Sequence, residues 1–318
     1  YGTPLVDLSQ TGGRVGGLLS SSKGLGITRA SLWRYYNVRD GKAGSVNATP
    51  TLHLDWRVNS HLLFHNSSYF IYSKRRWNNA ESLTYLNSPG STDAAGNAIA
   101  PGRIGRDRFY VYQNQHQVGD RLHAQFDFSI FGMKNRFVLG GDAYYLRFIR
   151  NRGFPSADYA DSVSLASPES TQLGSFVGEY PFMKSPTTMV QAGLFLEDVL
   201  TIRDNLRLVG GFRYDWLSLD RQNYTQAGQF NAATSFKGHY NPDNFRIGPV
   251  FDITKNISVY GVYTTGEDPP GSNLFLVNRG QFTRLSHSRQ GEIGVKASLW
   301  DGRFTTTLAL YDIRRTRM

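Results

Sequence analysis

The stretch Leu122-His123-Ala124-Gln125-Phe126-Asp127-Phe128-Ser129-Ile130 alternates between apolar and polar side chains at every position. Successive side chains of a β-strand point to opposite faces, so this alternation predicts a strand with one apolar face and one polar face. The segments 51–58, 206–216 and 292–299 follow the same scheme. No stretch of twelve residues combines apolar positions at helical spacing with a capping residue in front. The sequence therefore predicts an all-β fold.

The connections between the predicted strands alternate between short and long. We expect ten strands, near 48–58, 61–75, 107–131, 136–150, 187–202, 206–220, 244–254, 256–266, 287–300 and 303–317. Tight turns such as Arg203-Asp204-Asn205 and Asp301-Gly302 alternate with Gly-, Pro-, Ser- and Asn-rich connections near 76–106, 151–186, 221–243 and 267–286. Short turns at one end and long loops at the other are typical of outer-membrane barrels. We therefore predict an antiparallel transmembrane β-barrel domain at 48–318.

Residues 1–47 are predicted to form an external loop or a partial strand segment, with 27–37 as a candidate additional strand. Apolar runs reach no more than five residues, far short of the about 18 that mark a membrane helix. A membrane-spanning form must then be a closed barrel, because only helices and barrels satisfy their backbone hydrogen bonds in lipid. Both ends of the chain are interpreted as cuts within a longer sequence.

The composition limits the chemistry of the protein. The chain has no cysteine, which excludes disulfides and cysteine metal sites. The net charge of +10 favours an anionic partner, namely nucleic acid, lipopolysaccharide or an acidic ligand, although a solvated surface is the simpler alternative. No nucleic-acid-binding motif accompanies the charge, so no nucleic-acid partner is expected.

No catalytic or metal site is predicted. His61 and His65 are four residues apart, but on a strand this spacing separates them by about 13 Å. The glycine-rich segment 12–17 lacks the Lys-Ser/Thr of a phosphate loop. We therefore expect a protein that is not an enzyme and carries no cofactor.

Several motifs resemble those of TonB-dependent receptors. Gly193-Leu194-Phe195-Leu196-Glu197-Asp198, a short turn and then Gly211-Phe212-Arg213-Tyr214-Asp215 resemble the hairpin often written Y-x-Q-D followed by G-x-R-Y-D, with Phe195 and Glu197 where Tyr and Gln are usual. Segment 289–296, followed by Trp300-Asp301-Gly302-Arg303-Phe304, is similar to the E-x-G-x-K and D-G-R hairpin of the family. Segments 1–4, 137–142 and 258–266 also fit siderophore-type members. The resemblance covers nearly all of the chain, in order.

The resemblance implies a 22-stranded barrel in the bacterial outer membrane, closed by an N-terminal plug. About ten of these strands are expected here, and the plug domain is absent from the sequence. The implied function is TonB-dependent uptake of a ferric siderophore or similar metal chelate, with the TonB complex acting through the missing plug. Because a ten-stranded sheet would expose two edges to lipid, this portion alone is not expected to transport.

Basic and aromatic residues gather where the predicted strands meet the external loops. Guanidinium groups and aromatic faces bind anionic, aromatic chelates through charge-assisted hydrogen bonds and cation–π contacts. The candidate ligand-binding residues are Arg75, Trp77, Arg106, Arg108, Tyr110, Tyr112, Arg150 and Arg152. Alternatively, such arginines bind lipopolysaccharide phosphates. Four further residues are predicted to face the barrel lumen and to pair there, namely Arg213, Asp215, Glu292 and Lys296.

Two other functions remain open from the sequence. A non-transport outer-membrane barrel would act as an adhesin or surface-binding protein through its long loops, and its gene would encode no plug ahead of Tyr1. A carbohydrate-binding β-sandwich would also show strand alternation. It would be soluble without detergent, and its short and long connections would not be expected to alternate regularly along the chain.

Overall fold

A computed structural model describes residues 14–16, 34–80, 83–86, 89–93, 95–107, 109–153, 159–169, 171–172, 185–225, 227–268 and 285–316. These residues form strands, turns and irregular connections, and no helix occurs among them. This part of the chain accordingly has no helix long and apolar enough to cross a membrane.

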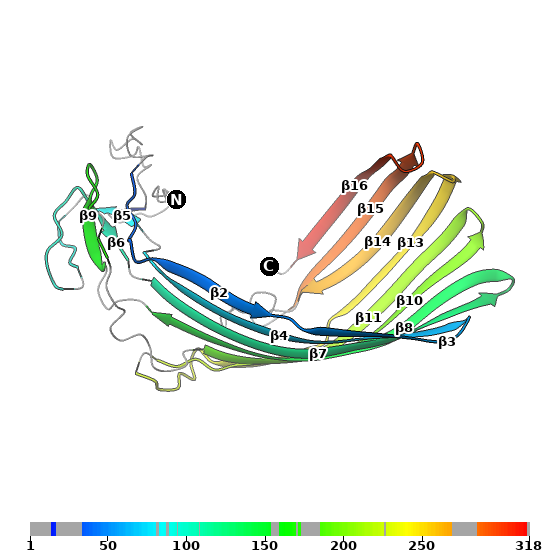
Figure 1. The fold of residues 1–318 in the computed structure, drawn as a ribbon, viewed down its shortest axis with the longest axis horizontal. Coiled ribbons are helices and arrows are strands. Elements are labelled where there is room, and N and C mark those ends of the chain that lie inside the picture. Colours follow the sequence, from blue (N-terminus) through cyan, green and yellow to red (C-terminus); the bar gives the residue numbers. More distant parts are fainter. Residues whose placement is uncertain are drawn as a thin grey trace.

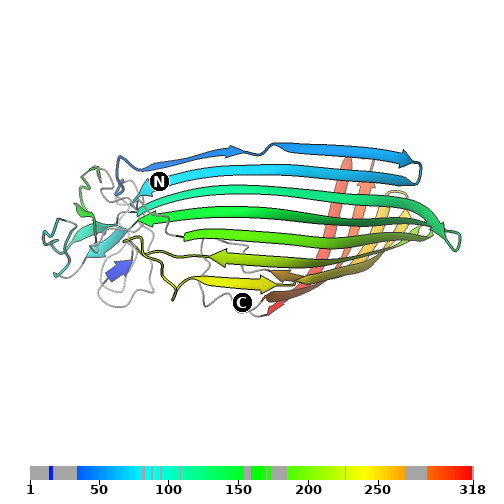
Figure 2. The same cartoon turned by 90° about the horizontal axis from the view of Figure 1, so that it is seen from below.

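A large antiparallel sheet contains twelve strands (Figures 1 and 2). They are β2 (Lys42–Ala48), β3 (Thr51–Asn59), β4 (Leu62–Asn79), β7 (Phe109–Ile130), β8 (Met133–Gly153), β10 (Ser185–Arg203), β11 (Leu206–Arg221), β12 (Phe236–Tyr240), β13 (Asp243–Thr254), β14 (Ile257–Asp268), β15 (Ser286–Leu299) and β16 (Phe304–Thr316). The order is β16-β15-β14-β13-β11-β10-β8-β7-β4-β2, with β3 also on β4 and β12 also on β11. The ten predicted strands are confirmed in this order.

Two of the long strands are interrupted at a proline. β2 and β3 pair one after the other with β4, and Thr49 and Pro50 separate them. β12 and β13 pair one after the other with β11, and Asn241 and Pro242 separate them. Proline has no N–H to donate to a strand ladder, which explains both breaks. The first strand of the sheet therefore begins at Lys42, earlier than the predicted 48. Residues 34–37 form no strand, and the rest of the candidate strand at 27–37 lies outside the described residues.

The register sorts the side chains of the large sheet onto two faces. We call the face that carries Phe126, Phe128, Phe212 and Trp216 the outer face, and the face that carries Arg213 the inner face. Phe128, Phe212 and Trp216 remain 43%, 42% and 46% exposed although they are large and apolar. The expected outer wall is therefore present, and these four side chains do not form the dry interior of a sandwich. Such a wall is what hydrocarbon covers in a membrane barrel.

The connections are sorted by length at the two ends of the sheet. The β3–β4, β7–β8, β10–β11, β13–β14 and β15–β16 turns lie together at one end, as predicted (Figures 1 and 2). The β7–β8 turn consists of Phe131 and Gly132, both with positive φ. We call this end of the sheet the turn end and the opposite end the loop end. The curved large sheet is open, with β2–β3 and β16 as edges that pair with no further strand among the described residues.

A second, four-stranded sheet lies at the loop end (Figure 1). It is formed by β1 (Arg14–Gly16), β5 (Leu83–Leu86), β6 (Arg103–Arg106) and β9 (Asp161–Ser164). β5, β6 and β9 come from segments that the sequence predicted only as long loops. Tyr36, Ile104 and Val163 are fully buried in its core. Segments of the long connections 76–106 and 151–186 are thus folded against one another.

Candidate functional site

A cluster of basic and aromatic side chains lies on the inner face near the loop end. The register places Arg75 opposite Gln113 and Gln113 opposite Arg150. One step further towards the loops, Trp77 lies opposite Val111 and Val111 opposite Arg152. We define the basic–aromatic cluster by its members on the inner face of β4, β7, β8 and β11, which are Arg75, Trp77, Phe109, Arg150, Arg152 and Arg221.

Ring contacts connect the members of the basic–aromatic cluster. The Arg75 guanidinium lies 5.3 Å from the centre of the Trp77 ring. Trp77 meets Phe109 edge-on at 5.6 Å between ring centres. The Arg152 guanidinium lies 5.4 Å from the Phe109 ring. Cations and aromatic faces therefore alternate along this part of the inner face, which is suited to a planar, anionic ligand.

Like charges are brought together in the same cluster. Arg152 and Arg221 lie close enough to Arg150 to repel its positive charge. Arg221 is 2% exposed, so little water screens these charges. A negatively charged ligand near Arg150 and Arg152 would be attracted by this concentration of positive charge. The arrangement thus favours a ligand with negative charge.

The predicted ligand-binding residues are divided among different locations. Arg75, Trp77, Arg150 and Arg152 belong to the basic–aromatic cluster. Tyr110 and Tyr112 have the strand parity of the outer face, where the Lys74 ammonium lies 5.7 Å from the Tyr112 ring. Arg108 lies outside the described residues.

Arg106 is enclosed by the small sheet. Its side chain is fully buried and forms an ion pair with Asp161. It also donates to the hydroxyl of Thr171 and to the carbonyl oxygens of Tyr36 at 3.3 Å and Asn37 at 3.2 Å. The guanidinium is occupied by the protein itself, so its role here is to hold three loop segments together.

A second ion pair stabilises the same sheet. The Arg103 guanidinium lies 3.5 Å from the Glu169 carboxylate, which also accepts a hydrogen bond from the Ser164 backbone N–H. Hydrogen bonds from the backbone N–H groups of Glu169 itself and of Ser164, with the nearby Arg103 charge, lower the pKa of the Glu169 carboxyl. Glu169 is therefore ionised at neutral pH, as this ion pair requires.

Phe109 and Arg221 were not among the predicted ligand-binding residues. Arg221 has the same strand parity as Arg213 and Asp215, so it continues their face one residue past the predicted strand end at 220. Phe109 has the parity of the polar face of β7, on which an aromatic residue is an exception. Strand parity was the signal that would have found both residues.

Nearer the turn end of the inner face, charged groups form a network across β7, β8, β10 and β11. Arg213 donates two hydrogen bonds to Asp142, each of 2.8 Å, and pairs with Asp215. Arg121 contacts Asp142 at 3.1 Å, and Gln191 donates to Asp215 at 2.9 Å. The structure thus places Arg213 and Asp215 together on the inner face, and their position in a barrel lumen stays a prediction.

Glu292 and Lys296 also lie on the inner face, but they share a partner instead of pairing directly. The hydroxyl of Tyr260 donates to Glu292 at 2.6 Å. The Lys296 ammonium lies over the Tyr260 ring at 5.1 Å. Gln290 adds a hydrogen bond of 2.9 Å to the other Glu292 oxygen.

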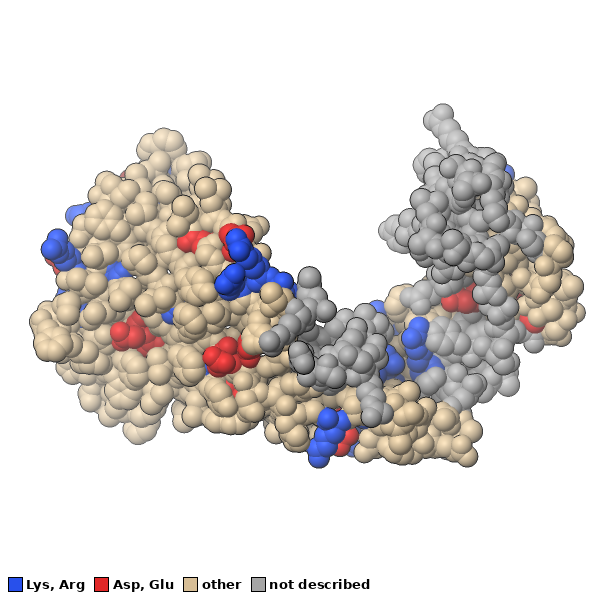
Figure 3. All heavy atoms as spheres, turned by 180° about the vertical axis from the view of Figure 1, so that it is seen from behind, with Lys and Arg blue, Asp and Glu red and all other residues tan. Residues whose placement is uncertain are grey.

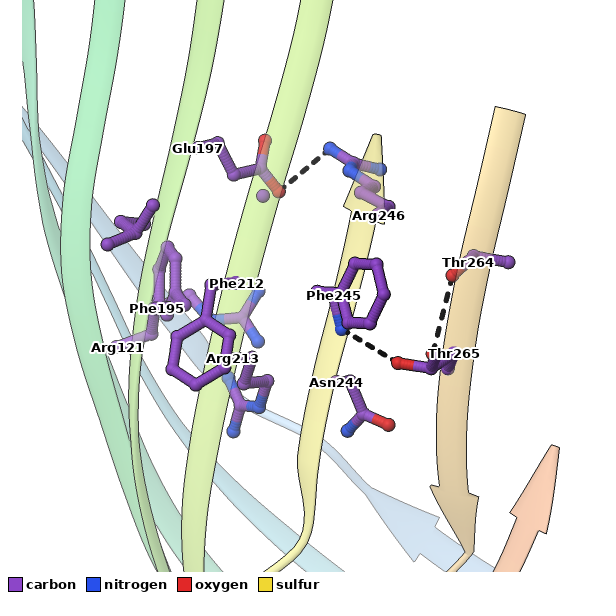
Figure 4. Close-up of a pocket in the computed structure, with 12 residues that line it drawn as sticks. Arg121, Phe195, Glu197, Phe212, Arg213, Asn244, Phe245, Arg246, Thr264 and Thr265 are labelled. Carbon is purple, nitrogen blue, oxygen red and sulfur yellow. Dashed lines mark hydrogen bonds and ion pairs between the residues drawn. The ribbon is translucent and has the colours of Figure 1, made fainter. Parts of the chain in front are cut away.

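A pocket of about 260 Å³ opens beside the Arg213 network. Figure 4 shows Phe195 between Arg121 and Arg213, with Glu197 turned towards Arg246 at 2.9 Å. This pocket is amphipathic and lies further from the loops than the basic–aromatic cluster. On the face of the molecule shown in Figure 3, by contrast, charged side chains form separate small groups on a mostly uncharged surface.

Comparisons with known proteins agree with this architecture. Residues 4–318 match the family model for the TonB dependent receptor-like β-barrel. The siderophore receptor PiuA from Acinetobacter baumannii is similar in structure, with a TM-score of 0.70 and 19% identity, over 87% of this chain and 41% of PiuA. The open form of the ferric-catecholate import receptor Fiu from E. coli K12 gives a TM-score of 0.73 and 15% identity, over 89% of this chain and 43% of Fiu.

The ferric citrate transporter FecA is a further structural relative, with a TM-score of 0.62 and 13% identity, over 95% of this chain and 39% of FecA. The chain thus spans about two fifths of the length of these proteins. The family consists of outer-membrane receptors and transporters and not of enzymes, in agreement with the prediction. From the match over residues 4–318, this chain belongs to the TonB-dependent receptor family, as part of its β-barrel domain.

Proposed function

We propose that this chain forms part of the wall of an outer-membrane receptor that imports an anionic ferric siderophore or a similar metal chelate. Further strands complete the barrel around it, because open sheet edges are not tolerated in hydrocarbon. Energy for import comes from the TonB complex, which acts on a plug inside the barrel.

The basic–aromatic cluster is the observation that supports this proposal. It lies on the inner face, where a molecule passing through a barrel would travel, and at the loop end, where such a molecule would arrive from outside. Charge-assisted hydrogen bonds from Arg150 and Arg152 would bind the negative oxygens of the chelate. The partly exposed Trp77 ring would stack on its planar groups, and the buried Phe109 ring packs edge-on against Trp77 and supports it.

Binding and uptake of a ferric tris-catecholate test the proposal, with the protein as its gene encodes it in cells that lack other receptors for this chelate. The double variant Arg150→Gln and Arg152→Gln should weaken binding at least about tenfold, because each charge-assisted hydrogen bond contributes about 1.5–3 kcal/mol. When the chelate carries radioactive iron, its uptake into the cells should require TonB. Arg136→Gln is the matched control, since Arg136 lies on the same face of β8 at the turn end, paired with Asp127 at 2.7 Å.

The control should bind as tightly as the wild type. Equal binding by the wild type and the Arg150/Arg152 double variant would contradict the assigned cluster. Uptake that persists without TonB would contradict the transport mechanism. Failure of the wild type to bind any ferric chelate would favour a surface-binding barrel.

A further inference from the structure

Three polar side chains form a hydrogen-bonded cluster on the outer face. The Asn66 side chain donates hydrogen bonds of 3.0 Å to both carboxylate oxygens of Asp120. The Ser68 hydroxyl donates to the same carboxylate at 2.5 Å. Ser68 lies directly opposite Asp120 in the register, and both have the parity of the outer residue Leu122. We call Asn66, Ser68 and Asp120 the polar trio.

The polar trio lies within the apolar band and not beyond it. The outer-face positions of β7 from Ile130 at the turn end to Val118 are apolar apart from Asp120, over a length of about 40 Å along the strand. With the strand tilt of about 45° typical of membrane barrels, this length spans about 28 Å, close to the height of a barrel's apolar wall. Asp120 is the outer-face position next to Val118, one step closer to the turn end. It is therefore placed where acyl chains meet the lipid headgroups.

The outer face has a groove at the position of the polar trio. A groove of about 760 Å³ is lined by apolar side chains together with two members of the polar trio. Its lining includes Leu52, Ser68, Phe70, Val118, Asp120 and Val190. The groove offers an apolar channel with a hydrogen-bonding carboxylate inside it, and Asp120 is exposed there.

Two cationic side chains lie on the outer face between the groove and the loop end. Arg147 and Lys74 are both exposed, and their register partners His116 and Asn114 are outer-face positions of β7. Arg147 is four residues from Ala143, the partner of Asp120, which is about 13 Å along β8. Going outwards along the wall, a lipid would therefore meet apolar side chains, then a carboxylate with hydroxyl and amide neighbours, then two cations.

We propose that this groove binds a phosphorylated glycolipid of the outer leaflet, the chemistry that lipopolysaccharide presents. The Asp120 carboxylate repels phosphate but accepts hydrogen bonds from sugar hydroxyls, so the polar trio contacts the sugar. Lys74 and Arg147 bind the phosphate above it. The apolar part of the groove holds an acyl chain. Because the site is on the outer face, it is separate from the chelate site proposed on the inner face.

Native mass spectrometry of the protein as its gene encodes it, in detergent with bis-phosphorylated lipid A, tests this site. The triple variant Lys74→Gln, Asp120→Asn and Arg147→Gln should bind lipid A at least about tenfold more weakly than the wild type. Arg136→Gln is the matched control, because Arg136 is on β8 like Arg147 but lies on the inner face, outside the basic–aromatic cluster. It should bind lipid A within about twofold of the wild type. Thermal melting followed by circular dichroism establishes that each variant is folded.

Two further ligands separate the parts of the proposal. Lipid A without phosphates should bind the wild type at least about tenfold more weakly, and phosphatidylglycerol should bind more weakly than intact lipid A. Equal binding of phosphatidylglycerol would overturn the assignment of a glycolipid. Equal binding of lipid A by the wild type and the folded triple variant would overturn the site itself. If the triple variant does not fold, Arg147→Gln alone is compared with Arg136→Gln, and equal binding by these two would overturn the phosphate contact.

Discussion

The Arg213 guanidinium reaches across a whole strand to the Asp142 carboxylate. Arg213 is on β11 and Asp142 on β8, and the two hydrogen bonds of 2.8 Å cross the intervening strand β10. At the crossing point β10 has Gly193, which the register pairs with Asp142 on one side and with Asp215 on the other. A Cβ atom at this position would overlap the Arg213 guanidinium and the Asp215 carboxylate. The glycine therefore makes the ion pair between non-adjacent strands possible.

Replacing Gly193 should destabilise the large sheet. We expect Gly193→Ala to lower the free energy of unfolding by about 1–3 kcal/mol, because the methyl group displaces charged groups that then lack their partners. Gly291→Ala is the control, since a Cβ there has no neighbour within 4 Å, and its effect should stay within about 0.5 kcal/mol. Urea unfolding in detergent measures both. Equal stability of Gly193→Ala and the wild type would show that the Arg213 network does not depend on the close approach.

The two partners of this ion pair should be energetically coupled. We expect Arg213→Gln and Asp142→Asn together to cost about 0.5–3 kcal/mol less than the sum of the two single variants, because each single change leaves a half-buried charge without its main partner. A double-mutant cycle on the free energy of unfolding measures the difference. Strictly additive costs would mean that the contact contributes nothing to stability.

Two neighbouring residues on opposite faces of β8 should differ in how much stability a new positive charge costs. Leu139 is 50% exposed on the outer face, and Val138 lies on the inner face opposite Gln125 and Glu197. Leu139→Arg should cost about 2–4 kcal/mol, because it places a cation against hydrocarbon near the middle of the membrane. Val138→Arg should cost less, since its side chain faces away from hydrocarbon and lies opposite the Glu197 carboxylate, which already pairs with Arg246. Folding yields into lipid vesicles measure both, and an equal loss would contradict the assignment of faces.

The small sheet should depend on its buried arginine. Arg106→Met removes the partner of Asp161 and the donors to three other groups, which we expect to destabilise the small sheet locally by about 3–5 kcal/mol. Amide hydrogen exchange should speed up in β5, β6 and β9 and stay unchanged in β10 and β11. Exchange that speeds up equally in both sheets would mean that Arg106 supports the whole fold.

Ten strands of the large sheet were predictable because they carry a local signal, whereas the short strands β2 and β12 lie mostly outside the predicted strands. Period-two alternation over nine or more residues and tight turns such as Asp301-Gly302 are both local features of the sequence. β5, β6 and β9 have only four residues each. β5 and β6 pair across a separation of about 20 residues within one connection, and β9, the other partner of β6, comes from another connection, so no local pattern indicates them. Pairing that depends on distant segments is not visible in a single short stretch.

The candidate site was predictable in part. Residue type and nearness to the loops identified Arg75, Trp77, Arg150 and Arg152. The same criterion also selected Tyr110 and Tyr112, whose even numbering on β7 matches the apolar positions of that strand and places them on the outer face. Arg106 was selected for its charge, and its burial results from the fold of the loops, which the sequence did not reveal.

The most direct test of the membrane wall is a cysteine scan of β10 at positions 190–192 and 194–197, in this chain, which contains no other cysteine. Position 193 is left out, because a Cβ there would overlap the Arg213 guanidinium. Each cysteine carries a spin label, and its collision rates with oxygen and with a water-soluble nickel chelate are measured in lipid vesicles. We predict oxygen maxima at the even positions, which include Leu194 and Leu196 on the outer face, and none at the odd positions. Oxygen accessibility without this alternation, or even positions shielded from both probes, would contradict the account.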